Sequence, residues 1–314
     1  MSELHGMVMR STGSRNWVLS DDGVLVECVV RGKFRIAGLN TTNPVTVGDF
    51  VFFTKKEEEE IGIITKIEER RNFILRKAIA HSRKVHILAA NIDQAVFIYT
   101  LKQPPTSRGF ADRFITTALA YHIPVVFIIN KTDLLTTEEE QQELIEVQHL
   151  YQGIGLEVLS LSALDDQYTE EVKGVFLQKT SFLGGHSGAG KTSLLNLIDP
   201  SLSLKTGEIS SYSQKGKHTT TFAQMFSLEG GGYIIDSPGI KEFGLVNFEE
   251  GELAHFFPEM EERMHECKFA NCLHLKEPGC AIKKAVENGE IAASRYKSYL
   301  SMLEDIREGS SAMF

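Results

Sequence analysis

Short apolar stretches alternate with polar positions and turn-forming residues over the first 72 residues. This spacing, which has no helical period, predicts a small all-β domain. We expect five strands that close into a barrel, and an OB-fold is a barrel of this kind that binds RNA. A β-sandwich or an SH3-like barrel fits the spacing equally well. The expected strands are 8–9, 17–19, 24–30, 47–54 and 61–67.

A second pattern begins near residue 81, where continuous apolar runs of strand length alternate with helical segments. This alternation is typical of an α/β domain with a mostly parallel sheet and helices on both faces. Beyond residue 248 the strands stop, and an acidic helical segment follows. We therefore divide the chain into domains at 1–72, 81–245 and 246–314. The expected strands of the middle domain are 95–101, 125–129, 156–159, 180–183 and 232–235, and the expected helices are 110–121, 138–152 and 191–198.

The composition is that of an ordinary globular protein. Hydrophobic residues make up 42% and charged residues 24%, which argues against a disordered, collagen-like or fibrous chain. The first residues lack a signal-peptide pattern, and no apolar run reaches the ~18 residues of a membrane helix. We therefore expect a cytoplasmic monomer with no membrane partner.

The net charge of −9 argues against a protein that binds nucleic acid through its overall charge. Residues 1–80 are the least acidic part, with 12 Lys and Arg against 11 Asp and Glu. Trp17, Phe34 and Phe73 lie near these basic residues, as a stacking surface for single-stranded RNA requires. The same aromatic residues would also suit the barrel core. The basic residues concerned are Arg31, Lys33, Arg35, Arg70, Arg71, Arg76 and Lys77.

A glycine-rich segment follows the expected strand 180–183 and opens the next expected helix. Its sequence, GHSGAGKT, fits the phosphate-binding pattern G-x-x-x-x-G-K-[ST]. The glycines let backbone N–H groups surround a phosphate, and the helix N-terminus adds partial positive charge. Lys191 would reach the β- and γ-phosphates, and the Thr192 hydroxyl would bind Mg²⁺. The expected phosphate-binding residues are Gly185, His186, Ser187, Gly188, Ala189, Gly190, Lys191, Thr192 and Ser193, together with Gly239 from a later loop.

The tetrapeptide NKTD directly follows the strand 125–129 and fits N-K-x-D. A carboxylate at Asp133 can accept two hydrogen bonds from guanine, and adenine lacks this donor pair, so a buried Asp133 would exclude ATP. Asn130 would hold the base and the loop, and the Lys131 stem would cover the base. Alone, the tetrapeptide could equally be a helix-capping turn, but beside a phosphate loop it indicates guanine binding. The expected guanine-binding residues are Asn130, Lys131, Thr132 and Asp133, with Ser162 and Ala163 from the loop after the next strand.

A third motif, DSPG, follows the strand 232–235 and fits D-x-x-G. Asp236 would hold Mg²⁺ through water, and the Gly239 N–H would bind the γ-phosphate. Between the phosphate loop and this motif lies a polar segment in which a threonine would fold over Mg²⁺. Thr219 and Thr220 are the candidates, and the sequence does not decide between them.

The order of these motifs is unusual, because N-K-x-D precedes the phosphate loop whereas Ras-like GTPases have the reverse order. The domain therefore has the order of a circularly permuted GTPase. With the motifs GxSGxGKT, GKHTTT and DSPG, a barrel before them and a Cys/His cluster after them, the chain resembles the RsgA (YjeQ) family of ribosome-biogenesis GTPases. The resemblance covers essentially the whole chain. It implies an N-terminal OB-fold, a central α/β circularly permuted P-loop GTPase domain and a C-terminal α-helical zinc-binding domain.

The resemblance also implies GTP and GDP binding, and association with the small ribosomal subunit and its rRNA late in its maturation. Ile240 stands where Ras-like enzymes carry the glutamine that orients the attacking water, so intrinsic hydrolysis should be slow. His218 is the nearest candidate for a replacement, and the resemblance assigns it a catalytic part. His218 could instead be a solvated loop residue or contact rRNA. Gly188 stands where some related GTPases use asparagine to hold K⁺, which puts potassium activation in doubt.

Four residues within fourteen positions form a candidate metal site: Cys267, Cys272, His274 and Cys280. Three thiolates and one imidazole suit a closed tetrahedral Zn²⁺, and the resembling family has the same ligand set. Because the protein fills all four positions, this one zinc would be structural. Free buried cysteines are the alternative interpretation, and a disulfide framework is disfavoured by the clustering.

Two other functions fit the sequence less well than a GTPase switch. An RNA-binding assembly factor could use GTP only as a structural ligand, which Ile240 would permit. An ATP-dependent kinase or ATPase would also carry a phosphate loop, but Asp133 disfavours adenine. Measuring GTP turnover distinguishes the GTPase from the assembly factor. Competition between GTP and ATP for binding distinguishes it from the ATP-dependent enzyme.

Overall fold

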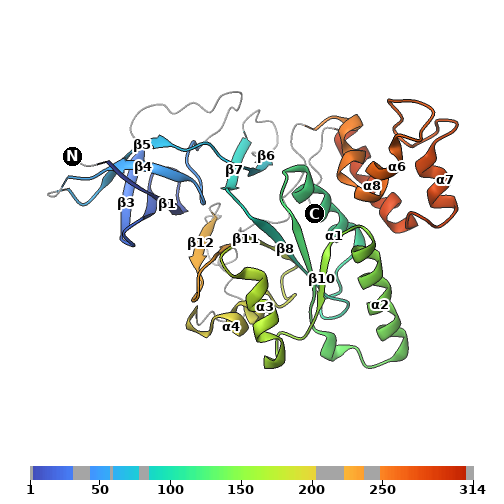
Figure 1. Ribbon diagram of the computed structural model, residues 1–314, viewed down its shortest axis with the longest axis horizontal. Helices are drawn as coiled ribbons and strands as arrows, with labels where there is room; N and C mark the ends of the chain where they lie inside the picture. The colour runs from blue at the N-terminus through green and yellow to red at the C-terminus, as the bar shows by residue number, and fades with distance from the viewer. Residues whose placement is uncertain are drawn as a thin grey trace. The chain divides into compact units, whose positions relative to one another are not determined.

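The computed structural model describes residues 3–30, 43–56, 59–77, 85–202, 223–236 and 248–308 (Figure 1). The chain forms two compact units, each built from segments that lie far apart in the sequence. None of the helices in these described ranges is both long enough and apolar enough to cross a membrane. The first unit comprises Met1–Ala95, Asp166–Leu183 and Lys191–Ile240, and the second comprises Val96–Asp165, Gly184–Gly190 and Lys241–Phe314.

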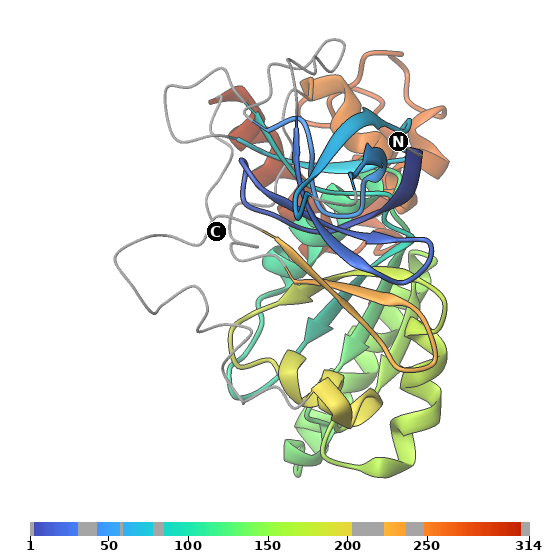
Figure 2. The ribbon, with the colours of Figure 1, turned by 90° about the vertical axis from the view of Figure 1, so that its left-hand side faces the viewer.

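The N-terminal strands of the first unit form a closed five-stranded barrel, whose blue strands curl around one another in Figure 2. Their order is β1-β2-β3-β5-β4, and β4 pairs back onto β1. Strands β3 and β5 run parallel, and the other pairs are antiparallel. The predicted OB-fold is therefore confirmed, and the sandwich alternative is wrong because the sheet closes on itself. The strands are β1 (Glu3–Ser11), β2 (Asn16–Ser20), β3 (Leu25–Val30), β4 (Phe50–Thr54) and β5 (Gly62–Ile67).

The alternation of side chains along each strand separates the barrel core from its exterior. In β2, Val18 is buried in the core, whereas its neighbour Trp17 is only half-buried. The guanidinium of Arg10 lies 4.7 Å from the centre of the Trp17 ring. Of the two interpretations of the aromatic residues, Trp17 therefore fits the exterior surface. Phe73 is half-buried, and Phe34 lies outside the described residues.

Arg70, expected among the basic residues of the barrel, forms a buried structural ion pair. Its Nε and Nη2 donate to the two carboxylate oxygens of Asp49 at 2.6 and 2.7 Å. Nη2 also donates to the Pro44 carbonyl, and Asp49 accepts the Thr46 N–H. Arg70 thus fixes the segment before β4 and is not available to an RNA partner. Arg71, by contrast, is exposed beside Asp93.

The rest of the first unit contains elements that the sequence pattern did not predict. The strands β6 (Phe73–Lys77) and β7 (Val85–Ala90) form a hairpin, and β12 (Gln224–Ser227) pairs with both β13 (Tyr233–Asp236) and β1. Strand β13 corresponds to the predicted strand 232–235, whereas β6, β7, β12 and helix α3 (Thr169–Phe176) were not predicted. These elements are short, so their periodicity is weak. The predicted strand β11 (Thr180–Gly185) begins in this unit beside β13, and the predicted helix α4 (Lys191–Ile198) belongs to it.

The second unit combines three strands in the order β10-β9-β8 with the helices of the C-terminal segment. Every residue of β8 and β9 is buried, which explains their continuous apolar sequences. Side-chain caps at Ser107 and Thr137 fix the starts of α1 and α2. The elements are β8 (Gln94–Tyr99), α1 (Arg108–Ala120), β9 (Val125–Ile129), α2 (Glu138–Gly153), β10 (Glu157–Ser160), the 3₁₀ helix η5 (Glu250–Phe256), α6 (Pro258–Met264), α7 (Ala281–Glu287) and α8 (Ala293–Arg307).

We predict that Asp49→Ala lowers the free energy of unfolding by about 3–5 kcal/mol, because it leaves the Arg70 guanidinium buried without its carboxylate. Urea unfolding followed by the fluorescence of Trp17, the single tryptophan, measures the effect within the barrel. Glu27→Ala is the matched control, since it breaks an ion pair with the exposed Arg15 and should cost below about 1 kcal/mol. Equal losses for the two variants would contradict the assignment.

Candidate nucleotide site and metal cluster

The side chain of Asn130 joins the three loops that the sequence assigns to nucleotide binding. Asn130 directly follows β9 and is buried. Its Nδ2 donates to the Ala189 carbonyl of the glycine-rich loop, and its Oδ1 accepts the Ala163 N–H, both at 2.9 Å. The N-K-x-D segment, the phosphate loop and the Ser-Ala loop therefore meet at one amide group.

The glycine-rich loop can approach Asn130 only because residue 190 has no side chain. Gly190 has a φ of +96°, and a Cβ there would lie 2.2 Å from Asn130 Nδ2. Gly185, with a φ of +131°, lies close to β8, where a Cβ would be 2.6 Å from the Ile98 carbonyl oxygen. These two glycines of the motif are thus required by close contacts and backbone conformation together.

The N-K-x-D segment presents its polar side chains on a tight turn. Lys131 has a left-handed backbone, and its Nζ donates to the Gln103 carbonyl. Thr132 N donates to the Leu161 carbonyl, which fixes the turn to the strand end at β10. Asp133 is exposed, whereas the sequence argument required a buried carboxylate. The turn Thr132–Leu134 has no buried residue, so burial of Asp133 would have to come from a bound base.

Two aromatic rings of helix α1 pack against the phosphate loop and the residue before it. The Phe110 ring stacks on the His186 ring with 4.2 Å between centroids. The Phe114 ring fills the space that a side chain at Gly184 would need, since a Cβ there would lie 2.4 Å from it. The loop conformation therefore depends on where α1 lies.

The remaining expected phosphate and magnesium residues are described only in part. Lys191, Thr192 and Ser193 open helix α4 directly after the loop, as predicted, and Thr192 is buried. Asp236 ends β13, but its side chain is not described. The other predicted residues lie outside the described residues: His218, Thr219, Thr220, Gly239 and Ile240.

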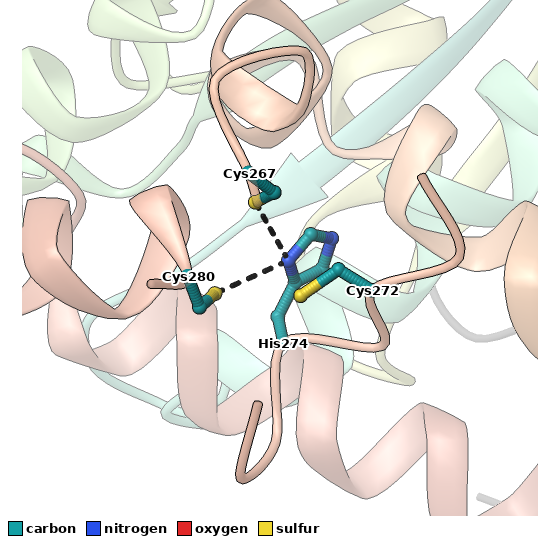
Figure 3. A group of neighbouring side chains, drawn as sticks. All are labelled: Cys267, Cys272, His274 and Cys280. Atoms are coloured by element: carbon teal, nitrogen blue, oxygen red, sulfur yellow. Dashed lines mark hydrogen bonds between the residues drawn. The ribbon is translucent and has the colours of Figure 1, made fainter. Parts of the chain in front are cut away.

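The four predicted metal ligands come together in the C-terminal segment (Figure 3). Their ligand atoms lie within 4.8 Å of one another. His274 Nδ1 faces the sulfurs of Cys267 and Cys280 at 3.7 and 3.4 Å. A tetrahedral zinc separates sulfur and nitrogen ligands by about 3.5 Å, so this arrangement can hold a metal ion of that kind.

The metal-ligand loop is held by side chains that sequence analysis missed. His274 has a φ of +56°, which is unfavourable for a residue with a Cβ. The Glu277 carboxylate accepts the N–H groups of Leu273, Leu275 and Lys276 at 2.8–3.0 Å. These bonds fix the backbone around His274. In the sequence, the Pro278-Gly279 dipeptide indicates a turn at this loop.

Burial favours the uncharged forms of three of the four ligands. Burial raises the pKa of the Cys272 thiol to about 12 and raises that of Cys280 as well. Burial also lowers the pKa of the His274 imidazole, so the ring stays neutral and able to bind a metal. None of the four cysteines forms a disulfide. A cation that binds here must displace thiol protons.

Comparison with known proteins identifies the family of this chain. The model for the RsgA GTPase matches residues 67–246, and the model for the RsgA N-terminal domain matches residues 5–64. The chain belongs to the RsgA GTPase family. Its relatives include proteins named small ribosomal subunit biogenesis GTPase RsgA from Christiangramia forsetii, 49% identical over 96% of both chains, and from Phocaeicola vulgatus, 47% identical over 98% of both.

Solved structures of related proteins share the fold. YjeQ from Thermotoga maritima superposes with a TM-score of 0.78 at 33% identity, and the match covers 97% of this chain and 99% of that one. YloQ, described as a circularly permuted GTPase, gives 0.74 at 29% identity and covers 98% and 96%. The predicted fold class and membership of the RsgA family are confirmed.

We predict that Gly190→Ala weakens GDP binding about ten-fold or more, because the added Cβ displaces Asn130 and leaves the Ala163 N–H unpaired. A fluorescent GDP analogue measures the affinity. Gly153→Ala in α2 is the control, since a Cβ there meets nothing within 4 Å. Unchanged affinity in Gly190→Ala would contradict the role of the Asn130 contacts.

Proposed function

We propose that this chain is a GTPase that binds the small ribosomal subunit late in its maturation and hydrolyses GTP to GDP and phosphate as a conformational switch. The observation that carries the proposal is the match, over nearly the whole chain, to relatives named for small-subunit biogenesis. The meeting of three nucleotide loops at Asn130 supports GTP as the ligand.

In this proposal each motif has a role in binding Mg²⁺ and GTP. Asp133 and the Ser162-Ala163 loop bind guanine, and Lys131 covers the base. The loop from Gly185 to Ser193, with Gly239, binds the phosphates. Magnesium is held by Thr192, by Asp236 through water, and by Thr219 or Thr220. His218 replaces the missing glutamine beside Ile240 and promotes attack by water.

We also propose that the Cys267, Cys272, His274 and Cys280 cluster holds one structural zinc ion. Its donor set fills a tetrahedron and leaves no position for a reactive water. The observation that supports zinc is the chemistry of the ligands, three thiols and one imidazole in a buried cluster. Bound there, the metal would tie the loop after α6 to the start of α7.

The barrel is the proposed RNA-binding part, and the protein is proposed to act as a cytoplasmic monomer of three domains at 1–72, 81–245 and 246–314. The exterior pair of Arg10 and Trp17 lies on β1 and β2, as RNA stacking on an OB-fold requires. Arg71 is also exposed, where it forms an ion pair with Asp93. The RNA partner would be the rRNA of the small subunit.

We predict that GTP turnover is slow for the protein alone and rises when purified small subunits are added, because the active site lacks the usual glutamine. His218→Ala should lower the stimulated turnover by about a hundred-fold and leave GTP affinity unchanged. Phosphate release measures turnover, and a nucleotide titration measures affinity.

His149→Ala, at an exposed position on α2, is the control for loss of a surface histidine. Turnover that does not respond to small subunits would support the alternative, an assembly factor with GTP as a structural ligand. Competition by ATP as strong as that by GTP would contradict guanine recognition. Full stimulated activity in His218→Ala would refute the role of that residue.

We predict that the apparent zinc affinity falls as the pH falls, by about ten-fold per pH unit for each thiol proton that zinc displaces. The raised pKa values of Cys272 and Cys280 mean that protons compete with the metal at neutral pH. Competition with a coloured chelator at several pH values measures the affinity. Cys28→Ser, outside the cluster, should leave the titration unchanged. A pH-independent affinity, or C-terminal helices that persist after zinc removal, would contradict the proposal.

A further inference from the structure

Helix α8 holds the backbone of the metal-ligand loop through two tyrosines. Tyr296 donates its hydroxyl to the His274 carbonyl at 2.5 Å, and Tyr299 donates to the Leu273 carbonyl at 2.9 Å. Both rings also pack in the C-terminal core, where Tyr299 is fully buried. The position of α8 and the shape of the ligand loop are therefore linked.

The same helix contacts α1 through a buried polar group. Arg295 Nη1 donates to Asp112 Oδ1 at 2.8 Å, and the Ser298 hydroxyl donates to Asp112 Oδ2 at 2.6 Å. Arg295 and Asp112 are both fully buried. Arg295 and Ser298 lie one turn apart on α8 and next to the tyrosines that hold the ligand loop.

Each charge in this contact is fully paired, which makes the geometry specific. Arg295 also donates to both oxygens of Glu259 from α6, and Tyr151 donates to Asp112 Oδ1 at 3.0 Å. Burial alone would lower the pKa of Arg295, but the Asp112 and Glu259 carboxylates raise it above its ordinary value. The guanidinium also lies 4.7 Å from the centre of the Phe257 ring. A shift of α8 relative to α1 would leave a buried charge without its partner.

Phe110 and Phe114, on the face of α1 opposite Asp112, contact the phosphate loop and Gly184, the residue before it. Phe110 stacks on His186, and Phe114 fills the space against Gly184. A single helix of thirteen residues thus bears both the buried carboxylate and the rings that support the loop. Movement of α1 changes both contacts together.

We propose that Asp112 and Arg295 couple the metal cluster to the phosphate loop, as positioning residues that act through α8 and α1. The metal orders the ligand loop held by α8, and the nucleotide orders the phosphate loop supported by α1. Both ligands then stabilise the same position of α8 relative to α1. Because such coupling is reciprocal, bound nucleotide strengthens metal retention, and bound metal strengthens nucleotide binding. This inference rests on the proposed binding of zinc and guanine nucleotide.

The test measures the rate of zinc loss to an excess of coloured chelator, with and without saturating GDP and Mg²⁺, in the full chain. GDP should slow zinc loss at least about five-fold in the unmodified protein. In Asp112→Asn the ratio of the two rates should fall close to one. A purely structural role would speed both rates alike and leave the ratio unchanged.

Asp305→Asn is the matched control, because it removes a partly exposed partner of Arg113 between the same two helices and should keep the ratio. Zinc content, GDP affinity and circular dichroism are measured first for every variant. If Asp112→Asn does not fold, Ser298→Ala takes its place, since it removes one hydrogen bond to Asp112 and should lower the ratio in part.

Equal rates with and without GDP in the unmodified protein would overturn the coupling but leave the proposed function intact. If the ratio of the two zinc-loss rates in Asp112→Asn equals that of the unmodified protein, the roles of these residues are overturned. The same holds for Ser298→Ala where that variant replaces it. Failure of the unmodified protein to bind GDP or zinc would overturn the proposed function, and this inference with it.

Discussion

The Asn130 amide is the interaction on which the candidate nucleotide site depends. One donor and one acceptor on a buried side chain hold two loops that lie 59 and 33 residues further along the chain. A buried amide is costly unless both of its ends are paired, so the loops and the side chain fix one another. Gly190 follows from this constraint, because only a residue without a Cβ lets the loop come so close.

Helix α1 extends this constraint beyond the nucleotide loops. Its aromatic residues support the phosphate loop, and its one buried carboxylate, Asp112, pairs with Arg295 of α8. Buried ion pairs contribute little net stability, but they penalise any arrangement that separates the partners. The helix can therefore specify the position of the loop relative to the C-terminal helices. A purely apolar contact would permit small shifts between them.

The C-terminal segment has a small hydrophobic core, and a bound metal would add to its stability. Residues between α6 and α7 have little regular structure and contribute all four candidate ligands. Glu277 and the two tyrosines of α8 satisfy the backbone groups of this loop, so the strained backbone of His274 is held from several directions. The side chains around the ligands are as much a part of the site as the ligands.

The sequence by itself determined an all-β first domain, the α/β pattern, the motif order and the four candidate metal ligands, and the pairing of β4 with β1 decided that the first domain is a closed barrel. These features depend on local periodicity, on glycine at fixed spacings and on the chemistry of clustered side chains. Only the tertiary structure decided that Arg70 is buried against Asp49, that Trp17 faces outward, and that Asp112 meets Arg295. The partners of the two ion pairs lie 21 and 183 residues apart in the sequence. A local sequence pattern does not indicate which distant charged residue pairs with a buried one. The short elements β12 and α3 escaped prediction for a related reason, since their stability comes from packing rather than from their own sequence.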